Sequence, residues 1–165
     1  AEVGRSALPR DIFTMSLLNT IIANTDKEKN KTFNIRRNVF TNEQGIDTNA
    51  DFDGFDDKAI HFLTYFESIP VGCARMRYLK DGIAKLERVA TLKKYRGKGA
   101  GTSVVKKAIE KAKSDDKNRI VLDSQYTARK LYEKLGFKIE GDIFEEIGIP
   151  HVKMYLDIKK IILPT

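Results

Sequence analysis

The stretch from Lys85 to Gly101 limits what this chain can fold into more than any other part of the sequence. Its first half is a mostly apolar run with β-branched members, which indicates a strand. Its second half sets three glycines among basic residues, at Gly97, Gly99 and Gly101. Apolar residues at helical spacing follow, namely Val104, Val105, Ala108, Ile109 and Ala112. The stretch therefore predicts a strand, a glycine-rich loop and a helix, in that order.

A loop that opens a helix presents unpaired backbone N–H groups and the positive end of the helix dipole. Glycines let an anion approach that backbone closely, so the expected guest is a phosphate. The nucleoside-triphosphate loop, Gly-x-x-x-x-Gly-Lys-Ser/Thr, and the dinucleotide fingerprint, Gly-x-Gly-x-x-Gly, are both absent. An ordinary turn with a helix cap is the alternative interpretation of the glycines.

Composition favours a globular protein with an anionic partner. The 165 residues include 41% hydrophobic residues, and 30 basic against 23 acidic residues give a net charge of +7. The basic residues are spread along the chain instead of forming a tract interleaved with aromatics, so we rank nucleic acid below an anionic cofactor. Residues 1–10 lack periodicity and are expected to form a flexible lead, followed by one domain over residues 11–165.

No apolar run approaches the ~20 residues that a membrane span needs, and no secretory signal pattern is present. We therefore expect a soluble, cytoplasmic protein with no membrane partner. Cys73 is the single cysteine and lies in an apolar context, which predicts a buried small residue and not a nucleophile. His61 opens an apolar strand and is expected to be structural. No histidine and cysteine cluster has metal-ligand spacing, so no metal is predicted.

The remaining pattern predicts an alternation of strands and helices. We expect a first strand over 12–22, an N-cap at Asp26 with a helix ending near Gly45, and a loop over 47–58 that is long enough to be functional. A hairpin is predicted for 60–66 and 71–78, and a turn at 80–82. The last elements are a strand at 119–123, a helix over 127–135 closed by Gly136, and strands at 137–140 and 151–158.

Two motifs resemble one superfamily in the right order. The segment from Arg96 to Gly101 resembles the Arg/Gln-x-x-Gly-x-Gly/Ala signature of the GCN5-related N-acetyltransferases (GNAT), which holds the pyrophosphate of acetyl-coenzyme A. The segment from Ala128 to Phe137 resembles the Ala-x-x-x-Tyr-x-x-x-Gly-Phe helix of that family. Further segments look like the small bacterial acetyltransferases of the ElaA and YjcF type: Val39-Phe40 with Glu43-Gln44, Asp53-Gly54 to His61, Leu86 to Val89, and Gly148 to His151.

This resemblance implies an α/β fold of the α+β kind, with a mixed, mostly antiparallel sheet flanked by helices. Its fourth and fifth strands would splay apart to admit the pantetheine arm of acetyl-coenzyme A or coenzyme A. The implied cofactor-binding residues are Val89, Ala90, Thr91, Arg96, Gly97, Lys98, Gly99, Ala100, Gly101 and Tyr132. The first three would act through their backbone, which can polarise the thioester carbonyl.

Acetyl transfer to an amine requires protonation of the departing thiolate, for which the resemblance places Tyr132. A thiol with pKa about 8.5 and a phenol with pKa about 10 differ little enough for positioning to offset. The alternative is that Tyr132 only packs its helix against the sheet. Glu87 and Asp123 are the best carboxylates to take the proton from the amine. Glu87 could instead pair with a neighbouring arginine to orient the sheet.

The acceptor is predicted from a narrower likeness. Asp123, Tyr132 nine residues later, and Glu87 resemble the arrangement of the glucosamine-phosphate N-acetyltransferases. This favours transfer by direct attack of the primary amine of an amino-sugar phosphate, best glucosamine 6-phosphate. A protein lysine or another small amine is the alternative acceptor, and a non-catalytic coenzyme A-binding domain is the alternative to an enzyme. The expected partner is thus a small-molecule amine.

A phosphorylated sugar also needs a cationic grip. Arg75, Arg77 and Arg88 are candidates, as is a basic residue from a second copy of the chain in a homodimer. Gln44 and His151 are further candidates for contact with the acceptor, because both belong to the segments that resemble the bacterial relatives.

Overall fold

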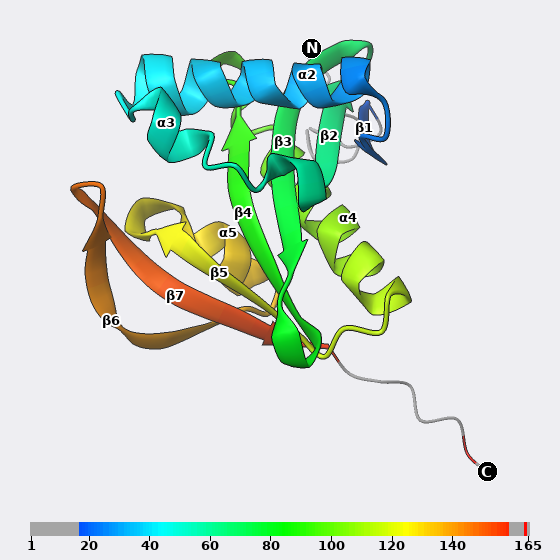
Figure 1. Cartoon of the computed structure of the whole chain (residues 1–165), viewed down its shortest axis with the longest axis vertical. Coiled ribbons are helices and arrows are strands. Elements are labelled where there is room, and N and C mark those ends of the chain that lie inside the picture. Colours follow the sequence, from blue (N-terminus) through cyan, green and yellow to red (C-terminus); the bar gives the residue numbers. More distant parts are fainter. Residues whose placement is uncertain (1–16, 159–163, 165) are drawn as a thin grey trace, which may run out of the picture.

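The computed structural model describes residues 17–158 and residue 164. Its frame is a seven-stranded sheet with the order β1-β2-β3-β4-β5-β7-β6 (Figure 1). The strands are β1 (Leu18–Ile22), β2 (Ile60–Phe66), β3 (Ile69–Tyr78), β4 (Ile83–Thr91), β5 (Arg119–Gln125), β6 (Lys138–Glu146) and β7 (Ile149–Asp157). All neighbours pair antiparallel except β4 and β5, which are parallel. The predicted mixed, mostly antiparallel α/β fold is confirmed.

Helices cover both faces of this sheet (Figure 1). They are α2 (Asp26–Arg36), the π-helical turn η1 (Arg37–Glu43), α3 (Thr48–Asp51), α4 (Ala100–Ser114) and α5 (Arg129–Lys134). Each face of the sheet has its own hydrophobic core, and successive strand residues point to opposite faces. Phe62 packs with α4, while its neighbour Leu63 packs with α2 and η1. The short 3₁₀ turns are η2 (Asp56–Lys58), η3 (Lys80–Gly82), η4 (Lys93–Tyr95) and η5 (Tyr126–Ala128).

The start of α2 differs from the prediction by one residue. Thr25, not Asp26, is the N-cap, because its hydroxyl accepts from the backbone N–H of Glu28 while the Glu28 carboxylate accepts from the backbone N–H of Thr25. This reciprocal capping box satisfies two backbone donors at once, and Asp26 in the first turn complements the helix dipole.

The parallel strands β4 and β5 part soon after they meet. Their pairing is confined to Ile83–Lys85 against Arg119–Val121. Beyond these positions β4 continues to Thr91 and β5 to Gln125 without bonding to each other. The predicted splay of the fourth and fifth strands is therefore present. On its other side, β4 bulges opposite Ala74, where the register with β3 shifts and Arg88 adopts φ of 54°.

The other predicted elements are found with shifted boundaries. The 47–58 loop contains α3 and η2, β3 begins at Ile69, and β6 runs on to Glu146 where only 137–140 was predicted. The predicted first strand survives as β1, and its part before residue 17 lies outside the described residues, as does the predicted lead over residues 1–10.

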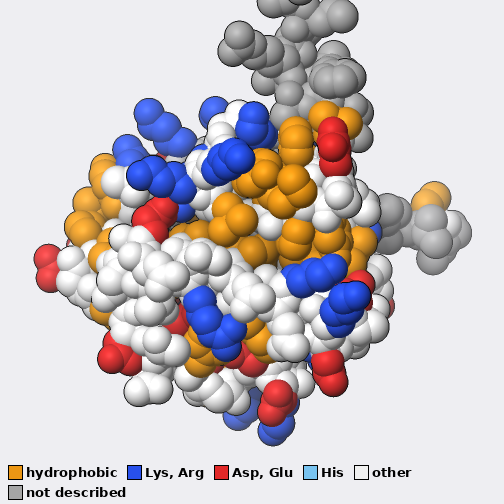
Figure 2. All heavy atoms as spheres, turned by 90° about the horizontal axis from the view of Figure 1, so that it is seen from above, with side chains coloured by type: hydrophobic (Ala, Val, Ile, Leu, Met, Phe, Trp, Pro, Cys, Tyr) orange, Lys and Arg blue, Asp and Glu red, His pale blue; other side chains and the backbone are white. Residues whose placement is uncertain are grey.

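Basic side chains occur at more than one place on the face seen in Figure 2, with acidic side chains between them. None of the helices over the described residues is long and apolar enough to cross a membrane.

Candidate active site

A cleft of about 520 Å³ lies where β4 and β5 have parted. Its walls come from the parted halves of both strands, from η1 and α3, from α5, and from the β6–β7 hairpin. Val89, Ala90 and Thr91 of β4, which we predicted to bind the cofactor, are among the lining residues. Because the edge of β4 that faces β5 has no strand partner here, backbone groups on that edge are available to a ligand unless a side chain bonds them, as Arg96 bonds the Thr91 carbonyl.

The glycine-rich loop leads from the end of β4 to α4. Gly97 and Gly99 have φ of 76° and 91°, the left-handed region that glycine enters without steric cost. The first backbone bond of the helix runs from Ser103 N–H to Gly99 O, and Gly99 provides no side-chain cap. Over the described residues, the N–H groups of Ala100, Gly101 and Thr102 thus have no acceptor. Such a cluster of free amides fits a diphosphate.

The side chains of Arg96 and Lys98, also in this loop, have partners elsewhere. Arg96 lines the cleft and donates from Nε to the Thr91 carbonyl at 3.1 Å, while its other end pairs with Glu43. It therefore ties the end of β4 to the end of η1. Lys98 carries its ammonium 5.7 Å from the centre of the Phe66 ring. Gly101 packs against α5, since a Cβ at this position would lie 3.1 Å from Leu131 Cδ2.

Tyr132 lines the cleft from α5 and is 6% exposed. Its ring packs edge-on against Phe137, with ring centres 5.8 Å apart. Its hydroxyl has no hydrogen-bond partner among the residues that the structure describes. Burial raises the pKa of the Tyr132 phenol above its ordinary value, so the group stays protonated at neutral pH. The Tyr132 ring is thus packed against Phe137, while its hydroxyl is a hydrogen-bond donor that no described residue uses.

Glu87 lines the cleft, but two arginines hold its carboxylate. Arg77 donates to both oxygens at 2.7 and 2.8 Å, and Arg75 donates twice to Oε2 at 2.9 and 3.1 Å. Burial by itself would raise the pKa of Glu87, but the hydrogen bonds and charges of Arg77 and Arg75 outweigh it and hold the pKa below its ordinary value. This depressed pKa makes Glu87 a poor base, and the orienting role that we weighed for it matches the contacts.

Asp123 is held more loosely. Its carboxylate lies 3.8 Å from the ammonium of Lys85, which is equally 3.8 Å from Glu87, and its side chain is 30% exposed. Sequence reasoning did not single out Lys85. Its spacing of two from Glu87 on one strand, which puts both side chains on one face, was the available signal. Lys85, Glu87 and Asp123 all line the cleft, so the structure brings both predicted carboxylates to the same site.

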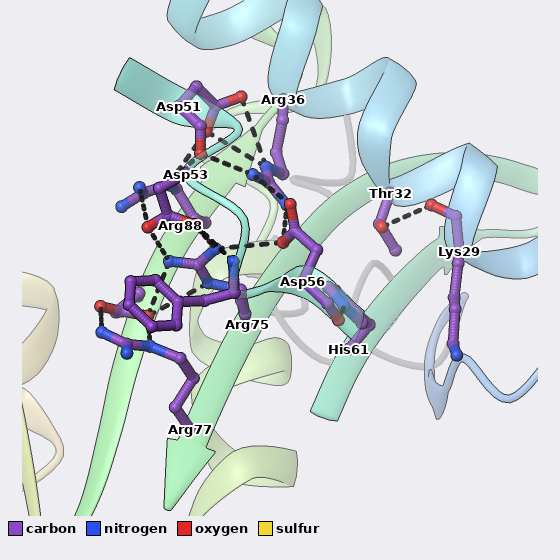
Figure 3. Close-up of polar contacts among 12 residues, drawn as sticks. Lys29, Thr32, Arg36, Asp51, Asp53, Asp56, His61, Arg75, Arg77 and Arg88 are labelled. Atoms are coloured by element: carbon purple, nitrogen blue, oxygen red, sulfur yellow. Dashed lines mark hydrogen bonds and ion pairs between the residues drawn. The ribbon is translucent and has the colours of Figure 1, made fainter. Parts of the chain in front are cut away.

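Arg75 and Arg77 do not line the cleft, contrary to their prediction as the grip for a substrate phosphate. Arg75 is fully buried, and its five N–H donors are all taken by Asp53, Asp56 and Glu87 (Figure 3). Arg77 is bonded to Glu87, and its guanidinium lies 4.2 Å from the centre of the Phe55 ring. Both arginines are bound within the protein.

Gln44 and His151, which we predicted to contact the acceptor, both line the cleft. Gln44 accepts a 2.9 Å hydrogen bond from the side-chain amide of Gln125, at the end of β5. No pattern in the sequence indicated a role for Gln125. His151 bonds through Nδ1 to the carbonyl of Ile149 at 2.7 Å, stacks on Phe144, and has Nε2 3.9 Å from Glu146.

Other candidate groups are structural. Cys73 is fully buried, and burial raises the pKa of its thiol to about 12, in line with its predicted inertness. His61 is buried beside the Asp56 carbonyl, 2.8 Å from Nε2, and burial lowers the pKa of its imidazole. Among residues 17–158, no group of histidine, cysteine and acidic side chains is arranged to hold a metal ion.

Comparisons with known proteins agree with this geometry. The family model of the acetyltransferase (GNAT) domain matches residues 17–158. The uncharacterized N-acetyltransferase YjcF of Bacillus subtilis is 33% identical over 142 residues, which cover 85% of this chain and 100% of YjcF. The crystal structure of Escherichia coli ElaA matches with a TM-score of 0.71 and 24% identity, over 84% of this chain and 97% of ElaA.

A Bacillus subtilis acetyltransferase crystallised in complex with CoA matches with a TM-score of 0.67 and 18% identity, over 86% of this chain and 99% of that one. Parted strands beside a helix with free N-terminal amides can receive an extended, phosphorylated ligand. The chain belongs to the GNAT family and is an N-acetyltransferase that uses acetyl-coenzyme A.

Proposed function

We propose that this protein transfers an acetyl group to the primary amine of a small molecule by direct attack, with both substrates bound in the cleft at once. The observation that carries this proposal is the parting of β4 from β5, which leaves the β5-facing edge of β4 at Val89–Thr91 without a strand partner beside the free amides that open α4. One extended ligand can satisfy both sets of groups.

The residues that would hold acetyl-coenzyme A divide between the parted strand β4 and the loop that opens α4, of which Arg96 and Gly101 line the cleft. The amides of Ala100 and Gly101, together with the open loop from Gly97 to Gly99, would receive the diphosphate. The Val89–Thr91 backbone would bond the pantetheine arm. Arg96 supports this arrangement, because its bond to the Thr91 carbonyl fixes the turn between the strand and the loop.

Acetyl-coenzyme A supplies a thioester, so that a C–S bond is exchanged for a C–N bond while the amine loses a proton and the sulfur gains one. We assign the hydrogen bond to the sulfur to Tyr132, whose hydroxyl is protonated and unused over the described residues. We assign removal of the amine proton to Asp123, directly or through a water molecule. Glu87 is the less suitable base, because four hydrogen bonds from arginines stabilise its charged form.

For the acceptor we retain an amino-sugar phosphate, with glucosamine 6-phosphate as the first compound to test. Because Arg75 and Arg77 are bound within the protein, we assign the contact with the phosphate to Lys85 instead. Lys85 lines the cleft, and its ammonium lies 3.8 Å from each of its two carboxylate neighbours. An ammonium held this loosely can turn toward a phosphate while Asp123 faces the amine. Gln44 and His151 would contact the rest of the acceptor.

The test is an acetyl-coenzyme A consumption assay over amino-sugar phosphates, unphosphorylated amino sugars, polyamines and lysine peptides. Glucosamine 6-phosphate should be acetylated faster than glucosamine, and Lys85→Gln should raise the KM for the phosphorylated sugar while leaving the KM for glucosamine unchanged. Activity on peptides with none on amino sugars would overturn the choice of acceptor. Coenzyme A binding without turnover of any amine would favour a binding domain.

A further inference from the structure

Six charged side chains form a closed ring beside the cleft, in which arginines and aspartates alternate (Figure 3). In order around the ring they are Arg36, Asp51, Arg88, Asp53, Arg75 and Asp56, which returns to Arg36. The arginines come from α2, β4 and β3, and the three aspartates come from the 47–58 segment. This segment, which the sequence marked as long enough to be functional, is thus joined to the sheet by ion pairs.

The part of the ring away from the cleft is rigid. Arg36 and Arg75 are almost fully buried, and Asp56 bridges them at 2.6 and 3.1 Å. Phe52 lies under the Arg36 guanidinium, 4.4 Å from ring centre to Cζ. Buried charges with this many partners cannot shift singly without leaving another charge unpaired. The ring therefore provides a fixed support for its remaining arginine.

That remaining member is Arg88, which lies in the bulge of β4. Its Nε lies 3.0 Å from the Asp51 carboxylate, and its Nη2 donates to Asp53 at 3.1 Å and to the Ala50 carbonyl at 3.3 Å. Its backbone φ of 54° is unfavourable for any residue with a Cβ. Side-chain contacts must offset this local cost, and those of Arg88 all lead to the 47–58 segment.

The residues after the bulge are the ones proposed to hold the acyl donor. Val89, Ala90 and Thr91 follow Arg88 directly, and the register of β4 against β3 resumes only at Ala90. The direction in which their N–H and C=O groups point therefore depends on the backbone conformation at Arg88.

We propose that Asp51 and Asp53 are positioning residues: by holding the Arg88 side chain they keep the strained bulge that aims the Val89–Thr91 backbone at the acyl donor. This inference rests on the proposed binding of acetyl-coenzyme A in the cleft. It assigns the acidic 47–58 segment to donor geometry and not to contact with the amine acceptor.

The deciding comparison is Arg88→Ala against Arg88→Gly. Both variants remove the clamp, by which we mean the bonds from the Arg88 side chain to Ala50, Asp51 and Asp53. Only glycine, however, adopts a positive φ without steric cost. Calorimetric titration with coenzyme A should show Kd raised about 5- to 30-fold in Arg88→Ala, the factor that corresponds to the strain of a left-handed residue, and within about threefold of wild type in Arg88→Gly. Hydrogen exchange of the 89–91 amides in the free protein should accelerate in Arg88→Ala by a similar factor.

Arg119→Ala is the matched control, because it removes an exposed arginine–aspartate pair away from the cleft and should change neither quantity. If Arg88→Ala does not fold, Arg88→Lys replaces it, since an ammonium lacks the fixed fork of donors with which the guanidinium bonds Asp51, Asp53 and the Ala50 carbonyl. Equal losses in the alanine and glycine variants would mean that the side chain itself contacts the ligand, and would overturn the inference. Unchanged Kd and exchange in Arg88→Ala would also overturn it.

Failure of this inference can be told apart from failure of the proposed function. A wild-type protein that does not bind coenzyme A would contradict the proposed use of the cleft, while the exchange rates of the free variants would still decide whether the clamp holds the bulge. Binding in wild type with unchanged exchange and Kd in Arg88→Ala would contradict the clamp alone.

Discussion

The side chain of Gln125 reaches across the cleft to Gln44, with 2.9 Å between the amide nitrogen and the carboxamide oxygen. Gln125 stands at the end of β5, and Gln44 follows η1, which packs against the opposite side of the cleft. A ligand seated between the parted strands would lie beside this bond. An exposed hydrogen bond contributes little to the stability of the fold. Loss of this bond should therefore mainly change the rate at which the ligand dissociates.

Gln125→Ala should raise the dissociation rate of coenzyme A several-fold and change the free energy of unfolding by less than about 1 kcal/mol. Stopped-flow displacement measures the first and urea denaturation the second. Gln44→Ala should have the same effect, and the double variant should be no worse than either single variant, because each removes the same bond. Additive effects would show that the two residues act independently.

Tyr132→Phe should lower kcat by about 10²-fold, since it removes the donor proposed to face the departing sulfur. The ring keeps its packing against Phe137, so the melting temperature and the Kd for coenzyme A should stay near their wild-type values. Single-turnover kinetics measure this change in the chemical step, because product release does not contribute to the observed rate. Turnover equal to wild type would reduce Tyr132 to a packing residue.

Asp123→Asn and Glu87→Gln should differ in kind. Asp123→Asn should flatten the limb of the pH–rate profile that reports the base and leave stability unchanged, because Asp123 makes one long ion pair. Glu87→Gln should keep that limb but lower stability by about 1–3 kcal/mol, since Arg75 and Arg77 lose a charged acceptor. An unaltered profile in Asp123→Asn would exclude it as the base.

Gly99→Asp should abolish detectable coenzyme A binding, while Gly99→Asn should weaken it by about tenfold or less. Asp and Asn side chains have the same shape, and at this position both residues would have to adopt the φ of 91° that Gly99 has. The difference between the Kd values of the two variants therefore measures the effect of the negative charge beside the free amides of α4. Titration calorimetry at low and high salt compares them. If both variants bind equally well, the diphosphate does not lie at this loop.

Acid should destabilise the protein through its arginine-bound carboxylates. Hydrogen bonds from Arg75 lower the pKa of Asp53, and Asp56 and Glu87 also have lowered pKa values because their arginine partners outweigh burial. Below about pH 5 the unfolded chain takes up protons before the folded one does, so the free energy of unfolding should fall with pH. Urea denaturation from pH 7 to pH 3 measures this fall, and Asp53→Asn should make it shallower.

Local patterns in the sequence predicted most of the frame. The glycine spacing from Gly97 to Gly101 placed the loop and the start of α4, and the alternation in β2 and β3 placed the hairpin, because both depend on near neighbours. Boundaries that depend on distant partners were missed. The strand β6 is exposed along its whole length and extends to Glu146 because β7 pairs with it, which no local pattern records.

The site was predicted in the same uneven way. Tyr132, Glu87 and Asp123 do line one cleft, but the assignment of Arg75 to a substrate phosphate was wrong, because its partners Asp53 and Asp56 are about twenty residues away in sequence. An arginine on a predicted strand looks free in the sequence until the fold brings carboxylates to it. Asp123 and Gln125 likewise meet their partners only through tertiary contacts.

The buried Cys73 has a practical consequence at the bench. It is the single cysteine of the chain, fully shielded behind the β4 bulge with Sγ 3.6 Å from the Arg88 carbonyl. With its pKa near 12 it stays a thiol at neutral pH, and chromogenic disulfide reagents react with thiolates. Such a dye can therefore be present throughout a turnover experiment and report each coenzyme A released, without titrating or inactivating the enzyme.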